Sequence, residues 1–534
     1  SSDLNKILFC LFLVLSAANA KYYSLDIDMN VQEISDDSYE TLIGDPRIVA
    51  TAKFVDHRNI SGWTYYTYQV NDDSPDWLQT FSAGYMEGYL AYDLIYDTWN
   101  NQQMYFKEMK ADPLFARKVN NFVNSQTAWI LQQIAKNPND NYWNLVNTTM
   151  AQVYGMYSGY LVAIAQNHRK DLNLTFEQFY TMTYMSDLFD VMAKFSPTNL
   201  KPLKCSFLAK MTNENLFTSH TTWFDYNGLL RTYKILTFNL KNPLVKTKRI
   251  TFSSQPGYTT SQDDYYTLDN NRFVSETSLS SDNNKVYEYL HYDSIPYWIR
   301  IHVANFVYDT PKSWIDAFFA HRSGTYCNQW FLVDFNNYKL YKNNTAQAKD
   351  IIWLVEEFYS LTSAQDVTQT LLIPQGYVAS YNVPYDPEIQ KLSKNPTNYT
   401  TDPRYYLFKK YAPGIKTMDD FRYVMRLNNK SDTGDYCQAI AARCDLSDKR
   451  EFPNGALDCK ATSDTMITNH QSWIIAGPTS ENLPPFTWEH YPEYNHSRAG
   501  IPTLWNFSWV FLDPNTNFTS AESDYSLTFE SDFI

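Results

Sequence analysis

Cys205 is the residue of this chain best suited to nucleophilic chemistry, and it lies in the stretch KPLKCSFLAKMTNENLFTSHTTW at 201–223. The nearest other cysteines, Cys10 and Cys327, are far away in the sequence. A thiol becomes a good nucleophile beside a base, and the α-amine of a chain that begins with cysteine is such a base. That amine has an ordinary pKa of about 7.7, so it can take the thiol proton and later return it to a leaving group. This chemistry requires a cut before Cys205.

The residues on either side of Cys205 suit self-cleavage of the Lys204–Cys205 bond. A thiol in a strained turn can attack the preceding carbonyl, and the resulting thioester is then hydrolysed. The segment FSPTNLKPLK at 195–204 has the composition of a surface linker, and a strand-like run follows it. We therefore expect two associated fragments: a mostly helical one at 21–204 and a catalytic one at 205–534.

The remaining cysteines have fewer chemical options. Cys437, Cys444 and Cys459 lie close together and can supply one local disulfide, but the sequence leaves the pairing open. If Cys10 is removed with a signal peptide, the odd count leaves at least one thiol unpaired, and Cys205 and Cys327 are the candidates.

Several common catalytic and binding signatures are absent from the sequence. It contains no Gly-x-Ser-x-Gly, His-Glu-x-x-His, Cys-x-x-Cys or EF-hand motif, and no phosphate-binding loop or dinucleotide fingerprint. We therefore expect no cofactor and no metal. A hydrolytic nucleophile would have to be a residue such as Cys205.

Two features predict passage through the secretory pathway. Residues 1–20 combine Lys6, an apolar run and small residues before Lys21, which is typical of a signal peptide cleaved after Ala20. The chain also holds nine Asn-x-Ser/Thr triplets, which predict a glycoprotein. They begin at Asn59, Asn147, Asn173, Asn343, Asn398, Asn429, Asn495, Asn506 and Asn517.

Charge and hydropathy restrict the partners. The net charge is -14 with a pI near 5.1, and no basic block is present, which argues against nucleic acid. No later apolar run is long enough for an integral membrane segment. An acidic lumen, such as that of a lysosome-like compartment, or secretion is the expected location.

The periodicity predicts an α+β fold with antiparallel sheets. Residues 77–136 read as helix, with more helix to about 195, whereas strand-like runs occupy 216–223, 249–260, 264–280 and 329–341. Helical stretches at 313–323 and 348–361 lie among these runs. At 44% hydrophobic and 17% aromatic residues, the chain can bury one large core or two ordinary ones.

The segment CSFLAKMTNENLFTSHTTWFDYNGLLRTYK at 205–234 resembles the start of the mature catalytic chain in phospholipase B-like proteins. These are lysosomal members of the N-terminal nucleophile (Ntn) hydrolase superfamily. Eight further segments follow the family's order: FSAGYMEGYLAYDLIYDTWNN before it, then PGYTTSQDDYY, SGTYCNQWFLVD, GYVASYNVPY, DPRYYLF, MRLNNKSD, AGPTSENLPPFTW and PTLWNFS. The resemblance covers most of the chain.

The resemblance implies a four-layer αββα sandwich of the Ntn type with an N-terminal helical portion. It also implies that Cys205 is the nucleophile and its freed amine the base, with His220, Trp223, Asn382 and Arg404 lining the site. Chemically, an amide N–H of Asn382 can donate to an oxyanion. His220 can orient the amine or thiol, and Arg404 can hold a carboxylate or phosphate or pair with an acid.

Three functions remain open. The first is hydrolysis of acyl esters in lipid degradation, as the family name implies. The second is an Ntn amidase that acts on N-acyl amines or small peptides. The third is a self-cleaved lumenal glycoprotein with a binding role and no turnover. The sequence leaves the oligomeric state open.

Overall fold

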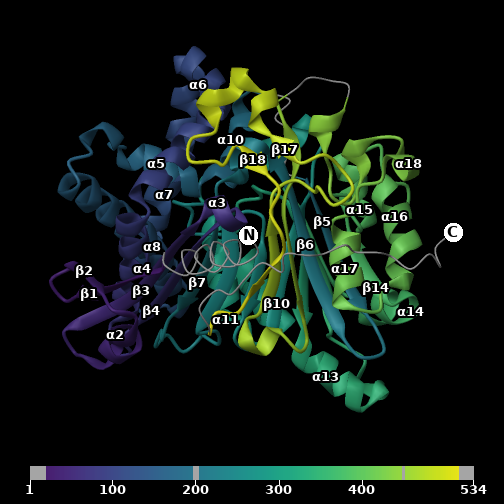
Figure 1. Ribbon diagram of the computed structural model, residues 1–534, viewed down its shortest axis with the longest axis horizontal. Coiled ribbons are helices and arrows are strands. Elements are labelled where there is room, and N and C mark those ends of the chain that lie inside the picture. Colours follow the sequence, from purple (N-terminus) through teal and green to yellow (C-terminus); the bar gives the residue numbers. More distant parts are fainter. Residues whose placement is uncertain (1–19, 197–203, 448–451, 516–534) are drawn as a thin grey trace, which may run out of the picture.

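The computed structural model describes residues 20–196, 204–447 and 452–515 (Figure 1). Apart from Ala20, the predicted signal peptide lies outside these residues, as do segment 197–203 and the sequon Asn517. The described chain combines helices with large, mainly antiparallel sheets, which confirms the predicted α+β class.

The larger sheet contains eleven strands, some from the part of the chain before residue 204 and some from the part after it. Strand β4 runs parallel to β7, whereas the other neighbours in this sheet are antiparallel. The strands are, in spatial order, β13 (Leu361–Asp366), β12 (Ile352–Phe358), β11 (Asn328–Asp334), β10 (Arg272–Ser278), β9 (Tyr265–Leu268), β8 (Arg249–Ser254), β7 (Arg231–Thr237), β4 (Trp63–Val70), β3 (Ile48–His57), β1 (Ala20–Asp26) and β2 (Val31–Ile34). The part of the chain before Cys205 therefore contributes strands as well as helices.

A second, six-stranded sheet carries the candidate nucleophile. Its order is β14 (Tyr377–Ser380), β5 (Lys204–Met211), β6 (Leu216–Asp225), β15 (Asn454–Ser463), β16 (Ser472–Ala476) and β19 (Val510–Leu512). A short pair, β17 (Phe486–Thr487) and β18 (Leu504–Trp505), stands apart. The two large sheets face each other, with the rings of Phe207 and Phe331 stacked at 4.1 Å between them.

The predicted N-terminal helical region is confirmed. It contains α4 (Asp76–Leu90), α5 (Tyr92–Asn101), α6 (Lys107–Ala111), α7 (Pro113–Lys136), α8 (Asn141–Gln166), α9 (Phe176–Thr183) and α10 (Met185–Phe195). Helices α4 and α8 touch through Gly84, Gly88, Gly155 and Gly159, where an added Cβ would lie only 1.9 to 2.0 Å from a backbone oxygen of the other helix. Only glycine allows this approach.

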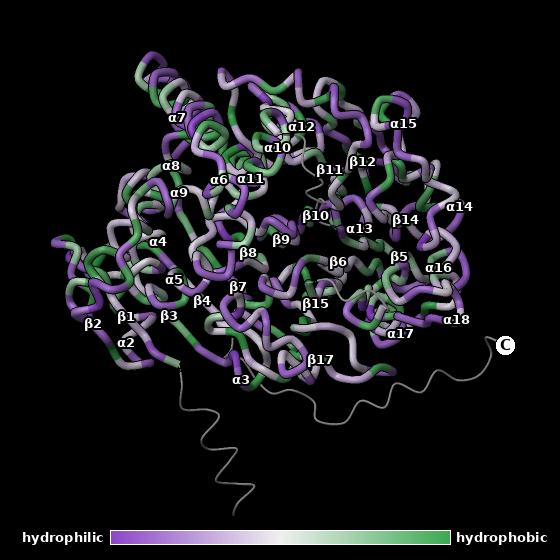
Figure 2. The backbone as a smooth tube through the Cα atoms, turned by 90° about the horizontal axis from the view of Figure 1, so that it is seen from above, coloured by the Kyte–Doolittle hydropathy of each residue, from purple (hydrophilic) through white to green (hydrophobic). Residues whose placement is uncertain are grey.

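Helices cover the outer faces of both sheets (Figures 1 and 2). On the larger sheet, hydroxyls of Tyr66 and Tyr68 in β4 donate to carbonyls of α4, which joins that helix to the strand. On the smaller sheet, α16 (Pro403–Tyr411) and α17 (Met418–Met425) pack against Leu208 and Phe217. The remaining helices are α2 (Asp36–Thr41), α3 (Arg58–Ser61), α11 (Tyr297–Val307), α12 (Pro311–Phe319), α13 (Phe335–Asn343), α14 (Ile373–Gln375), α15 (Pro387–Ser393) and α18 (Lys430–Thr433).

One predicted element is wrong in type, and another is correct only in its first half. The stretch at 348–361, expected to be helical, contains strand β12 between β11 and β13. Its two acids, Glu356 and Glu357, resemble a polar helix face in the sequence, yet both are buried and hydrogen-bonded, Glu357 to Arg300 at 2.8 Å. The strand-like run at 329–341 is strand β11 up to Asp334 and helix α13 after it, where the Asp334 carboxylate caps the backbone N–H groups of Asn336 and Asn337.

The cysteine pairing left open by the sequence is settled by the structure. Cys437 and Cys444 form a disulfide. Among the described cysteines, Cys205, Cys327 and Cys459 are free and buried.

Candidate active site

Strands β5 and β6 place Cys205 at the interface of the two sheets. Cys205 is the second residue of β5 and lies opposite Thr222, while His220 lies opposite Phe207. Directly opposed residues of an antiparallel pair point to the same face, and that face alternates along the strand. Cys205, His220 and Thr222 therefore share the face that meets the larger sheet, where Cys205 is 1% exposed.

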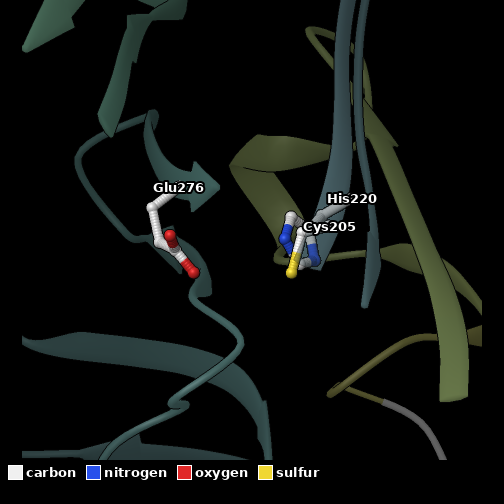
Figure 3. A group of neighbouring side chains, drawn as sticks. All are labelled: Cys205, His220 and Glu276. Atoms are coloured by element: carbon white, nitrogen blue, oxygen red, sulfur yellow. The ribbon is translucent and has the colours of Figure 1, made fainter. Parts of the chain in front are cut away.

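Glu276 completes a group of three reactive side chains (Figure 3). The Cys205 sulfur, a His220 ring nitrogen and a Glu276 carboxylate oxygen all lie within 4.8 Å of one another. Glu276 comes from β10 of the facing sheet, so nothing in its local sequence pointed to the site. A thiol, an imidazole and a carboxylate are also zinc ligands, but a metal here would occupy the sulfur that the nucleophile hypothesis requires.

Burial favours the uncharged forms of these three side chains. Burial raises the pKa of the Cys205 thiol well above its usual range, and the neighbouring Glu276 acts in the same direction. Burial and Asp264 likewise raise the pKa of Glu276. The pKa of His220 is well below its usual range, because the ring is buried and Lys460 is close. The thiol therefore needs a base before it can attack.

Lys460 influences which nitrogen of His220 carries the proton. Its ammonium lies 3.3 Å from Nδ1 and can only donate, which favours the tautomer of the neutral ring in which Nδ1 accepts. In that tautomer the proton is on Nε2, which is buried. The ring of His220 also has a hydrogen bond to the backbone of Glu276, the residue that faces Cys205.

Asn382 and Arg404 gather at the backbone of Cys205, away from its sulfur. The Cys205 N–H donates to Asn382 Oδ1 at 2.9 Å, and Arg404 Nη1 donates to the Cys205 carbonyl at 2.6 Å and to the same Oδ1 at 3.0 Å. Asn382 has a φ of 67°, a conformation that asparagine tolerates better than most residues. Its side chain thereby holds the atom that would become the α-amine.

The side-chain amide of Asn382 also has a donor side. One N–H of its Nδ2 donates to the carbonyl of Ser278 at 2.8 Å, and the second N–H of the same amide can still donate to an oxyanion.

Trp223 lies on the other face of the sheet and contacts Arg404. The guanidinium carbon is 4.5 Å from the centre of the Trp223 ring, and the indole N–H donates to the Ile440 carbonyl at 3.0 Å. Asp402 pairs with the Arg404 Nε at 3.4 Å. Trp223 therefore supports the arginine, whereas His220 contacts the thiol side.

A buried ionic network adjoins His220, and the sequence analysis missed it. Arg231 contacts Asp263 at 2.5 Å and Asp458 at 2.8 Å, and Lys460 contacts the same two carboxylates at 3.0 and 2.7 Å. The two cations hold the pKa of Asp263 well below its ordinary value. The available signal was the pair of charged residues Asp458 and Lys460, two positions apart in the run GALDCKA at 455–461.

The predicted glycosylation sites lie on the surface where they are described. Asn59, Asn147, Asn173, Asn343, Asn398, Asn429, Asn495 and Asn506 are all exposed. Within the described ranges, no helix is both long and apolar enough to span a bilayer.

Comparison with known proteins identifies the family. Residues 50–512 match the phospholipase B family, a range that contains all five predicted site residues. The chain belongs to the phospholipase B family. It is 30% identical to phospholipase B-like protein B of Dictyostelium discoideum, over 90% of this chain and 87% of the relative. Phospholipase B-like 1 of Rattus norvegicus is 30% identical over 81% of both chains, and phospholipase B of Crotalus adamanteus is 29% identical over 81% of this chain and 82% of its own.

Family membership confirms the resemblance drawn from nine short segments.

Proposed function

We propose that this protein hydrolyses acyl ester or amide bonds by transfer of the acyl group to Cys205. The observation that carries the proposal is the pair of contacts around that residue: its backbone nitrogen is held by Asn382, and its thiol faces His220 and Glu276. The names of the relatives, phospholipase B and phospholipase B-like, support acyl lipids as substrates.

Maturation precedes turnover in this proposal. The Cys205 sulfur attacks the carbonyl carbon of Lys204, and the Lys204–Cys205 amide bond breaks as the thiol proton passes to the leaving nitrogen. Water then hydrolyses the thioester. The products are a carboxylate on Lys204 and a free amine on Cys205. Fragments 21–204 and 205–534 stay associated, because β4 is paired along its length with β7 in the larger sheet.

The freed amine then acts as the base. It accepts the thiol proton, the sulfur attacks the substrate carbonyl, and the second amide N–H of Asn382 stabilises the oxyanion. The ammonium returns the proton to the leaving alcohol or amine. Water, activated by the amine, hydrolyses the acyl thioester and restores the thiol. Asn382 positions the amine, and Arg404 disfavours its protonated form by charge repulsion.

The wider fold and surface support the same assignment. The order helices, sheet, sheet, helices supports the four-layer αββα sandwich of Ntn hydrolases. Eight exposed sequons support a glycoprotein of the secretory pathway. Buried acids with raised pKa values, such as Asp190 at about 7, favour the folded state in acid. We place the protein in a lysosome-like lumen or outside the cell.

One experiment separates hydrolysis from the non-enzymatic alternative. The cleaved protein is incubated at pH 5 with acyl phospholipids and N-acyl amides, beside Cys205→Ala and Cys205→Ser. We expect turnover by the cleaved protein and none by the alanine variant, which should also remain a single chain. Turnover by Cys205→Ala would refute the mechanism, and its fragmentation would mean that another protease makes the cut. Cleavage of the native chain without turnover on any substrate would favour a binding role.

A further inference from the structure

Self-cleavage before Cys205 needs a proton carrier other than the one that serves in turnover. In the uncut chain the nitrogen of Cys205 is part of a peptide bond, so the α-amine that acts as base in the mature enzyme does not yet exist. The thiol must still lose its proton when the sulfur attacks the Lys204 carbonyl carbon, and the leaving nitrogen must gain one. Another group beside the thiol has to move this proton.

Glu276 of β10 lies where such a carrier is needed (Figure 3). A carboxylate oxygen of Glu276 and the Cys205 sulfur are within 4.8 Å of each other, a separation that a small rotation or one bridging water closes. The same strand also approaches the Cys205 nitrogen. The Ser278 carbonyl accepts from Asn382 Nδ2 at 2.8 Å, and Asn382 Oδ1 accepts from the Cys205 N–H at 2.9 Å. Strand β10 therefore lies beside both atoms between which the proton must travel.

Two other titratable groups near the thiol are less suited to carry the proton. Burial and the nearby Lys460 lower the pKa of His220, so its ring resists taking up a proton. Asp263 contacts Arg231 at 2.5 Å and Lys460 at 3.0 Å, so it stays a carboxylate and has no proton to give. A group that moves a proton between sulfur and nitrogen must both accept one and donate one.

The carboxyl of Glu276 meets that requirement. Burial and the neighbouring Asp264 raise the pKa of Glu276 well above its usual range, which favours the protonated form. A protonated carboxyl has one O–H that donates and one oxygen that accepts. Hydrogen bonds with the hydroxyls of Tyr326, at 3.2 Å, and Ser278 hold it beside the thiol.

We propose that Glu276 is the proton carrier of self-cleavage and thus a catalytic residue of maturation. As the bond forms between the Cys205 sulfur and the Lys204 carbonyl carbon, one Glu276 oxygen takes the thiol proton. The other oxygen releases its proton to the Cys205 nitrogen, and the carbon–nitrogen bond breaks. The products are a thioester and a free amine, and the carboxyl is protonated again.

This relay forms no lone charged side chain in the buried site, where such a charge would be costly. The inference rests on the proposed function, because it states how the α-amine used in turnover is produced.

The test follows self-cleavage and not turnover. The expressed chain is labelled with a short isotopic pulse, and the appearance of fragment 205–534 is followed on denaturing gels. We expect Glu276→Gln and Glu276→Ala to be cut at least about a hundredfold more slowly than the native chain, the usual contribution of a positioned acid–base group. Glu33→Gln, at an exposed position of the edge strand β2 in the same sheet, is the matched control and should be cut at the native rate.

Chemical rescue separates proton transfer from the shape of the side chain. Uncut Glu276→Ala is purified and incubated with formate, which supplies a carboxyl group, or with formamide, which has nearly the same shape but no carboxyl group. We expect formate to speed cleavage at least about tenfold, because it restores an acid–base group, and formamide to have no effect.

Cleavage of Glu276→Gln at the native rate, no rescue by formate, or equal rescue by formamide would overturn the proposal. Cys205→Ala is run beside these variants. A native chain that stays uncut, or a Cys205→Ala chain that is cut, contradicts the proposed function itself. If the native chain is cut, Cys205→Ala is not, and Glu276→Gln is cut at the native rate, only the role of Glu276 is wrong.

Discussion

Replacing Arg404 by glutamine should move the pH dependence of the mature enzyme. Arg404 Nη1 and the Cys205 nitrogen both contact Asn382 Oδ1, at 3.0 and 2.9 Å, so the two nitrogens are at most about 6 Å apart. At an effective dielectric constant of about 20, two positive charges at that separation repel by about 3 kcal/mol. Asp402, 3.4 Å from the Arg404 Nε, offsets part of this repulsion.

The remaining repulsion should lower the amine pKa from about 7.7 to between about 5.7 and 6.7. A base with that pKa is partly available at pH 5. Arg404→Gln removes the charge, so the amine pKa should return toward 7.7. Activity at pH 5 should then fall about ten- to a hundredfold and recover largely at pH 8.

The assay is kcat/KM against pH from 4.5 to 9, normalised to the cleaved fraction seen on a denaturing gel. Arg404→Lys retains the positive charge but not the guanidinium shape. Its acid limb should stay near the native position, which would show that the charge, and not the shape, sets the amine pKa. Lys409→Gln, on the exposed side of the same helix, removes a charge far from the amine and is the matched control. An acid limb that stays in place in Arg404→Gln, or that moves to lower pH, would refute the assignment of the amine as base.

Two further predictions concern stability. Burial raises the pKa values of Asp190 and Glu356 to about 7, so the folded state favours their protonated forms. The contribution of these two groups to stability should be largest near pH 4 and fall as the pH rises toward 8. In Asp190→Asn the thermal unfolding temperature should change less with pH, because protonation of Asp190 accounts for at most roughly 4 kcal/mol of the pH-dependent unfolding free energy. An unchanged slope would contradict the argument. Gly155→Ala should destabilise the protein by about 1–3 kcal/mol or more in chemical unfolding, since its Cβ would lie 1.9 Å from the Phe81 carbonyl oxygen. Gly44→Ala, with open space around it, is the control, and equal stability of the two variants would show that α4 and α8 separate easily.

Much of the fold followed from local patterns. The helices between residues 76 and 195 and the strands near 216–225 have strong periodicity, and their type was predicted correctly. Local pattern failed for β12, because its two glutamates are buried against partners that come from distant segments. In the sequence alone, glutamates within a short apolar run are interpreted as the polar face of a helix, because the pattern does not show which distant groups pair with them.

The sequence by itself determined which residue types this chain offers for chemistry and to which family it is similar. It singled out Cys205, His220, Trp223, Asn382 and Arg404, and the structure brings all five into one neighbourhood. The reason is that a solitary cysteine after a linker and a set of ordered motifs are local features of the chain.

Only the tertiary structure decided how those residues divide their work. It places His220 at the sulfur, Asn382 and Arg404 at the backbone of the same cysteine, and Trp223 beneath the arginine. It also adds Glu276, which no local pattern marked, because that carboxyl reaches the thiol from the opposite sheet. Protonation states and hydrogen-bond partners depend on distances between segments that are far apart in sequence, and those distances exist only after the sheets have packed.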